Sequence, residues 1–167
     1  MTVWGRSLTL GAVAAVAITL ASCVSSGGVA TPADVPSSCD ELISNQNLYE
    51  YNPNLAANPA YEPSPLAANI VAEGGISCGW LNASNGIELS MTMRQAGPDE
   101  WQEIRAAAAD EAGSTPLTKV DGVISYSEGL GVVQAYISGR WVVIESTGVS
   151  AEGDVLMLLR ALSLPSD

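Results

Sequence analysis

The most regular pattern in the chain is an alternation of apolar and polar side chains over residues 87–94. Its apolar positions are Ile87, Leu89, Met91 and Met93. A period of two predicts a β-strand with one buried face and one face in solvent. We interpret the two methionines as core side chains rather than as a soft-metal site, because thioethers fill irregular gaps well.

Four further strands are predicted on either side of this one. They cover residues 76–83, 118–127, 131–138 and 140–146. Asn85-Gly86 predicts a two-residue hairpin turn before the strand at 87–94. Ser138-Gly139 predicts a turn between the last two strands.

Helices are predicted before and between these strands. Ser38 and Glu41 form a capping-box pattern, which predicts a helix over residues 39–47. Pro98 stands at a tolerated first helical position and opens a second helix, for which Gly113 is a plausible C-cap.

A last helix is predicted near the C-terminus. Val155, Leu158, Leu159 and Leu162 have helical spacing after an N-cap candidate at Ser150. The resulting order, α-β-β-α-β-β-β-α, predicts an α+β fold in which helices cover an antiparallel-rich sheet of about five strands.

Residues 52–75 contain four prolines and show no clear period. A stretch of that length without secondary structure is uncommon in a small domain and is usually functional or mobile. Tyr49, Tyr51 and Tyr61 lie at its start and middle and define a candidate binding loop. Either the tyrosines hold the loop against the core, or they form the rim of a binding site.

The N-terminal segment is typical of a secretory signal, with a weakly positive start and an apolar run over residues 7–20. Leu20-Ala21-Ser22-Cys23 resembles the bacterial lipobox. The resemblance implies cleavage of a signal peptide, residues 1–22, between Ser22 and Cys23, and attachment of fatty acyl chains such as palmitate to Cys23. Residues 23–37 then form the lipidated cysteine and a flexible tether, and residues 38–167 one domain. An uncleaved anchor helix and an ordinary cysteine are the alternatives.

The composition narrows the function. Of 167 residues, 18 are acidic, 6 are basic and none is histidine, so the net charge is −12. Nucleic-acid binding needs basic charge, so nucleic acid is not expected as a partner. His-based catalytic triads and histidine-ligated zinc sites are excluded as well.

Two cysteines remain beside Cys23. In an oxidising compartment Cys39 and Cys78 predict one disulfide. A redox-active or metal-binding pair is the alternative, and the long separation without a Cys-x-x-Cys motif argues against it.

Cys39, the Pro-rich loop and Cys78-Gly79-Trp80, together with the lipobox, resemble small actinobacterial lipoproteins. The pattern is also loosely similar to the extracellular sensor domains of mycobacterial serine/threonine kinases, which carry more disulfides, and to Mog/PsbP-like lipoproteins. The resemblance implies a disulfide-stabilised domain on the outer face of the cytoplasmic membrane and implies no catalytic residues. Trp80 is expected to pack near the disulfide.

No nucleophile-elbow, phosphate-loop, dinucleotide or calcium-loop motif is present, so we expect no enzyme activity, cofactor or metal. The predicted function is a surface lipoprotein, held at the membrane by its lipid, with a non-catalytic domain that binds an envelope protein or an apolar ligand. The alternative is a small cell-envelope hydrolase with paired carboxylates roughly 5–9.5 Å apart. Glu88 and Glu145, each on a predicted strand with apolar flanks, are the acids to inspect.

Overall fold

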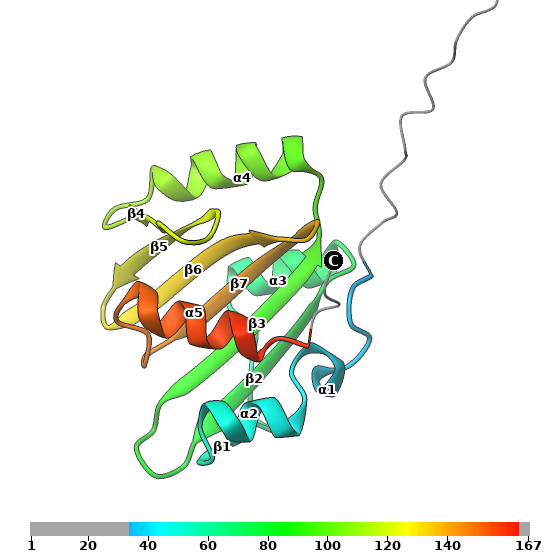
Figure 1. Ribbon diagram of the computed structural model, residues 1–167, viewed down its shortest axis with the longest axis vertical. Coiled ribbons are helices and arrows are strands. Elements are labelled where there is room, and N and C mark those ends of the chain that lie inside the picture. Colours follow the sequence, from blue (N-terminus) through cyan, green and yellow to red (C-terminus); the bar gives the residue numbers. More distant parts are fainter. Residues whose placement is uncertain (1–33, 164–167) are drawn as a thin grey trace, which may run out of the picture. The chain divides into compact units, whose positions relative to one another are not determined.

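A computed structural model of the chain describes residues 34–163. Within them, seven antiparallel strands form one sheet, accompanied by five helices, so the α+β class is as the sequence predicts (Figure 1). The strands are β1 (Leu55–Ala57), β2 (Ile76–Asn82), β3 (Glu88–Gln95), β4 (Thr115–Pro116), β5 (Gly122–Ser127), β6 (Leu130–Ile137) and β7 (Arg140–Ser146). Their order across the sheet is β1-β2-β3-β7-β6-β5-β4, which makes β7 the central strand. The expected signal peptide, Cys23 and most of the tether lie outside the described residues.

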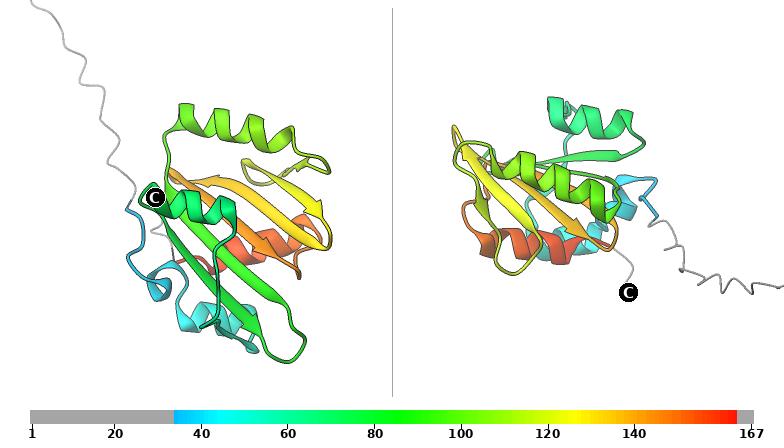
Figure 2. Two further views of the ribbon diagram at one scale, coloured as in Figure 1. Left: turned by 180° about the vertical axis from the view of Figure 1, so that it is seen from behind. Right: turned by 90° about the horizontal axis from the view of Figure 1, so that it is seen from above.

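Helices cover both faces of the sheet, as the two views in Figure 2 show. One face carries α1 (Cys39–Leu42), α2 (Asn45–Tyr51) and α5 (Glu152–Ala161). The other face carries α3 (Pro65–Ala72), which contacts β2 and β3, and α4 (Pro98–Ala109), which contacts β5 and β6. We call these the apolar face and the polar face, after the strand residues that each presents.

The apolar face forms the main core. Leu89, Met91 and Met93 of β3 are buried there as the alternation predicts. The predicted disulfide joins Cys39 at the start of α1 to Cys78 of β2, with Cα atoms 5.7 Å apart. Trp80 is buried in the same cluster as Cys78, as expected. Closing a loop of about 40 residues contributes about 4 kcal/mol to stability by the chain-entropy model.

The polar face is not in solvent, and this prediction from the alternation was wrong. Thr92 of β3 has no exposed area, and Ser90 is only 7% exposed. Their positions are covered because α3 and α4 lie over this face. Trp101 of α4 is 1% exposed and stacks on Tyr136 of β6, with ring centroids 5.7 Å apart.

The sequence suggested that residues 52–75 lack secondary structure, but the structure shows two elements there. They are β1, which pairs antiparallel with β2, and the helix α3. The hydroxyl of Ser64 accepts a hydrogen bond from the Ala67 N–H, and Pro65 occupies the first helical position, a combination that favours a helix start. With β4 at the other edge, the sheet has seven strands rather than about five.

Three local predictions also differ from the structure. The helix expected over 39–47 is two helices, because Ile43 is extended and Ser44 caps a new helix. The connection at Asn85-Gly86 is a five-residue loop, since β2 ends at Asn82 and β3 begins at Glu88. The N-cap of α5 is Ala151 rather than Ser150, whose N–H and hydroxyl both donate to Asp154 instead. The Ser138-Gly139 turn is confirmed, with positive φ at both residues.

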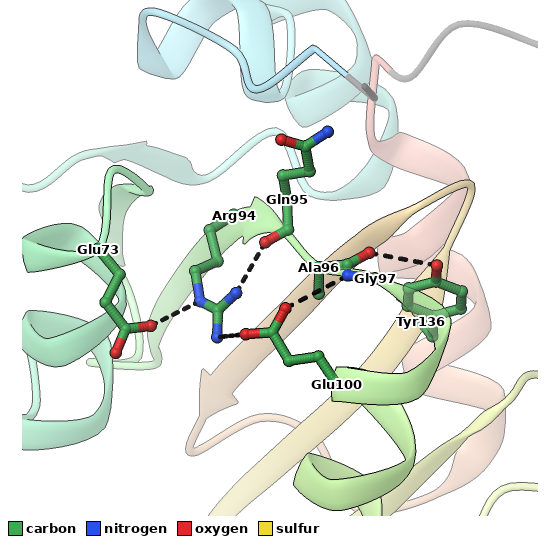
Figure 3. A network of polar contacts seen from close by, with 7 residues as sticks. All are labelled: Glu73, Arg94, Gln95, Ala96, Gly97, Glu100 and Tyr136. Carbon is green, nitrogen blue, oxygen red and sulfur yellow. Dashed lines mark hydrogen bonds and ion pairs between the residues drawn. The ribbon is translucent and has the colours of Figure 1, made fainter. Parts of the chain in front are cut away.

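Arg94 joins the two helices of the polar face (Figure 3). Its side chain is 11% exposed, and its guanidinium carbon lies 4.9 Å from the centroid of the Trp141 ring. Nη2 donates to Glu100 of α4 at 2.7 Å, Nη1 donates to the Gln95 carbonyl, and Nε forms an ion pair with Glu73, which caps α3, at 2.9 Å. One buried cation thus fixes the end of α3 and the start of α4 on the same strand.

Stability should therefore depend on the ionisation of Glu100. The hydrogen bond from Arg94 lowers the pKa of Glu100 below its ordinary value of 4.5. A lowered pKa in the folded state gives stability that is present above pH 4.5 and is lost as the pH falls through the folded-state pKa. In urea titrations, the gap in free energy of unfolding between the protein and Glu100→Gln should shrink as the pH falls below 4.5.

Glu103→Gln, on an exposed position of the same helix, is the matched control and should keep the profile of the parent protein. A gap for Glu100→Gln that stays constant over the whole pH range would contradict the ion-pair interpretation.

Candidate functional site

A cavity of about 350 Å³ opens on the polar face, at the end of the sheet where β3 begins and β7 ends. That volume lies within the ordinary range of ligand pockets, roughly 300–1,000 Å³. The lining residues come from the segment before α3 and from β2, β3, β6 and β7. They are Asn58, Ala60, Tyr61, Glu62, Ser64, Trp80, Glu88, Leu89, Ser90, Leu130 and Glu145.

The Tyr61 ring lies directly against β2, and Gly79 makes this close approach possible. A Cβ atom at residue 79 would overlap the Tyr61 ring. The Tyr61 hydroxyl is 2.7 Å from the Ser77 hydroxyl, which is 2.6 Å from the hydroxyl of Thr92. These two hydrogen bonds satisfy the hydroxyl groups of Ser77 on β2 and Thr92 on β3, which lie on the covered face of the sheet.

The backbone before Tyr61 is attached to the same strand. The Asn58 N–H donates to the Gly79 carbonyl at 2.9 Å, and the Tyr61 N–H donates back to the Asn58 carbonyl at 3.2 Å. The Asn58 side chain accepts from the Ala60 N–H at 3.0 Å and closes the turn. Residues 58–64 therefore form a fixed wall of the cavity.

The register brings two carboxylates to this cavity. Ser90 of β3 pairs with Glu145 of β7, and the Ser90 hydroxyl donates to Glu145 Oε2 at 3.2 Å. Glu88 precedes Ser90 by two residues and faces the same side, so it is the diagonal neighbour of Glu145, with Cα atoms roughly 7–8 Å apart. Glu145 is half-buried, whereas Glu88 and the third acid, Glu62, are exposed.

No basic side chain of the described region lines the cavity. Of the 6 basic residues, Arg6 lies outside that region, and the other five are placed elsewhere. Arg94 pairs with Glu73 and Glu100, Arg105 pairs with Asp121, and Arg140 donates to the Asp34 carbonyl. Lys119 interacts with Glu152, and Arg160 lines a second cavity. None of the three cavity acids forms an ion pair within residues 34–163.

The structure brings together some of the residues that the sequence singled out. Tyr61, Trp80, Glu88 and Glu145 line one cavity, although the sequence analysis treated them separately. Tyr49 and Tyr51 lie on α2, which covers the apolar face, and are not near Tyr61 in this arrangement. Tyr49 is 64% exposed, whereas burial raises the pKa of the half-buried Tyr51.

Tyr51 lines the second cavity, of about 260 Å³, between α2 and α5.

Sequence reasoning missed Glu62, Ser90 and Leu130 as site residues. Ser90 was visible only as a polar position in the alternation of β3, and Glu62 had no signal of its own.

Two further findings concern the described residues. Among residues 34–163, no helix has both the length and the apolar character needed to cross a membrane. The same region contains no group of three or more Cys, Asp or Glu side chains arranged to hold a metal ion.

Comparison with known proteins found no matching family, curated protein or solved structure.

The contact between Tyr61 and residue 79 can be tested by a double-mutant cycle. Gly79→Ala should lower the free energy of unfolding by roughly 1–3 kcal/mol, because the added methyl group displaces the ring. In a Tyr61→Ala background the same substitution should cost much less, since the overlapping atoms are gone. Urea unfolding followed by circular dichroism measures all four proteins.

Gly153→Ala is the control glycine substitution, because nothing lies within 4 Å of a Cβ at that position of α5. It should be neutral or slightly stabilising. An equal cost for Gly79→Ala with and without the Tyr61 ring would contradict the proposed contact.

Proposed function

We propose that this protein is a lipid-anchored surface lipoprotein whose non-catalytic domain binds a ligand or partner in the cavity beside Tyr61. One observation carries the proposal: the cavity combines a ligand-sized volume, the side chains of Tyr61 and Leu130, and carboxylates without an ionic partner in the described region. Binding sites typically join an apolar lining with a few well-placed polar groups.

The position of the cavity supports display away from the membrane. Arg140, at the start of β7, donates from Nε to the Asp34 carbonyl at 2.8 Å and so attaches the beginning of the described chain to that end of the sheet. Glu145 lies five residues further along β7, about 17 Å away at the rise of an extended strand. With a lipid on Cys23, ten residues would lie between the anchor and Asp34, and the eleven Cα–Cα steps from Cys23 to Asp34 would span at most about 40 Å.

A hydrolase with paired carboxylates is the second candidate, and the diagonal placement of Glu88 and Glu145 favours it. Their Cα separation of roughly 7–8 Å is compatible with a carboxyl pair across a scissile bond. However, a general acid of this kind works in a desolvated cleft, and Glu88 is solvent-exposed. We therefore favour binding over catalysis.

The anchor is tested by Cys23→Ala in the full chain, expressed in a bacterial host. Without the thiol no acyl chain can be attached, so the protein should move from the membrane fraction to the medium. Cell fractionation with immunodetection measures the distribution. Ser25→Ala, two residues further on, should leave the protein in the membrane fraction, and membrane retention of Cys23→Ala would contradict lipid anchoring.

The binding site is tested by photo-crosslinking in living cells. A photoreactive amino acid in place of Ala60, which is exposed and lines the cavity, should yield a reproducible adduct that mass spectrometry identifies. The same amino acid at Glu103, on an exposed position of α4 outside the cavity, should not yield it. No adduct at residue 60, or the same adducts from both positions, would contradict a binding role for this cavity.

A further inference from the structure

The cavity has a charge pattern that defines what it can hold. Three carboxylates line it, and all five basic side chains of the described region lie elsewhere. An anionic ligand would meet only like charge, whereas a fully apolar ligand would leave half-buried Glu145 without a partner for its charge. A cation, in contrast, supplies the opposite charge that Glu145 lacks within the described region.

We propose that the cavity binds a primary ammonium group on a short apolar stem, the chemistry of a lysine side chain. This inference rests on the proposed function and specifies its ligand. A lysine of a protein partner and a free diamine both present this group, and the experiment below distinguishes the two sources.

Glu145 is the central acceptor for this group. It lies on the central strand and is the half-buried member of the three acids, so solvent screens its charge less than that of Glu62 or Glu88. The Ser90 hydroxyl holds Oε2, and no described residue donates a hydrogen bond to Oε1. An ammonium group at this position has three donors, enough for Glu145 and for either neighbouring acid.

One other lining residue suits the stem. The Leu130 side chain lies half-buried at the β6 side of the cavity, on the same face of the sheet as Glu145. The Tyr61 ring, fixed over Gly79, adds an aromatic surface that attracts a nearby cation. A methylene stem can thus contact apolar groups while its charged end reaches the carboxylates.

A metal ion fits this site less well. Calcium takes six to eight oxygen ligands, and the described residues contain no acid cluster with metal-binding geometry. An ammonium group needs no such shell, because separate hydrogen bonds from different directions satisfy it.

The test uses the full chain in a nonionic detergent, with leucine and methionine methyl groups labelled for NMR. The probes are Nα-acetyl-lysine methylamide, 1,5-diaminopentane and, as the neutral match of the first, Nα-acetyl-norleucine methylamide. The lysine probe should shift the methyl signals of Leu130 in a saturable manner and leave that of exposed Met157 on α5 unchanged. The norleucine probe, which lacks the charge, should not produce these shifts.

Glu145→Gln should weaken the affinity for the lysine probe about tenfold, the size expected for a lost charged hydrogen bond. Glu103→Gln removes the same charge from α4, outside the cavity, and should change the affinity less than about twofold because exposed charges are screened. Tighter binding of the lysine probe than of the diamine identifies a protein side chain as the source, and the reverse identifies a free amine; either supports the ammonium proposal.

Two results would overturn it. Equal shifts with the norleucine probe would mean that the cavity takes an apolar ligand, so the charge argument fails while a binding function at the cavity stands. No shift with either amine would also reject the ammonium proposal. Photo-crosslinking at residue 60 then decides separately whether the cavity binds anything, which keeps the two failures distinct.

Discussion

The Tyr61 ring can lie directly on the sheet because residue 79 has no side chain, and the geometry of the candidate site depends on this close approach. With the ring in place, its hydroxyl reaches Ser77, and the backbone of Asn58 hydrogen-bonds to Gly79. The segment before α3 is thereby held as a wall over β2 and β3. A side chain at residue 79 would displace the Tyr61 ring and with it this wall.

The two faces of the sheet are stabilised in different ways. On the apolar face, burial and the Cys39–Cys78 disulfide suffice. The polar face is covered too, so each buried polar group needs a partner. The Ser77 hydroxyl is hydrogen-bonded both to Tyr61 and to Thr92, and Arg94 finds carboxylates on both covering helices. Glu145 lies on the same face but in the cavity, and within the described region only Ser90 contacts it through a hydrogen bond. The site is therefore the part of this face where charge is left without an internal counterpart.

The sequence predicts what depends on local pattern and fails where distant segments meet. Alternation identified β3 and its buried face, and Ser138-Gly139 identified a hairpin. The same alternation could not reveal that α3 and α4 cover the polar face, since that depends on tertiary packing. Tyr61, Glu88 and Glu145 stood out singly for their chemistry. Their meeting depends on the pairing of β3 with β7, between residues 55 apart in the case of Ser90 and Glu145, and no local signal encodes it.

With the lipid anchor proposed above, a site of this kind can bind weakly and still be effective. The ion pair with Glu145 supplies about the tenfold in affinity expected above, roughly 1.4 kcal/mol, so contacts of the stem with Leu130 and the Tyr61 ring have to supply the rest. Confinement near a membrane raises the effective concentration of a partner confined to the same surface, and this adds apparent affinity without any new contact. The net charge of −12 acts in the same direction, because its field concentrates cations around the domain before any specific contact forms. In the proposed complex, selectivity rests on the fit of the stem beside Tyr61, whereas attraction rests on the carboxylates.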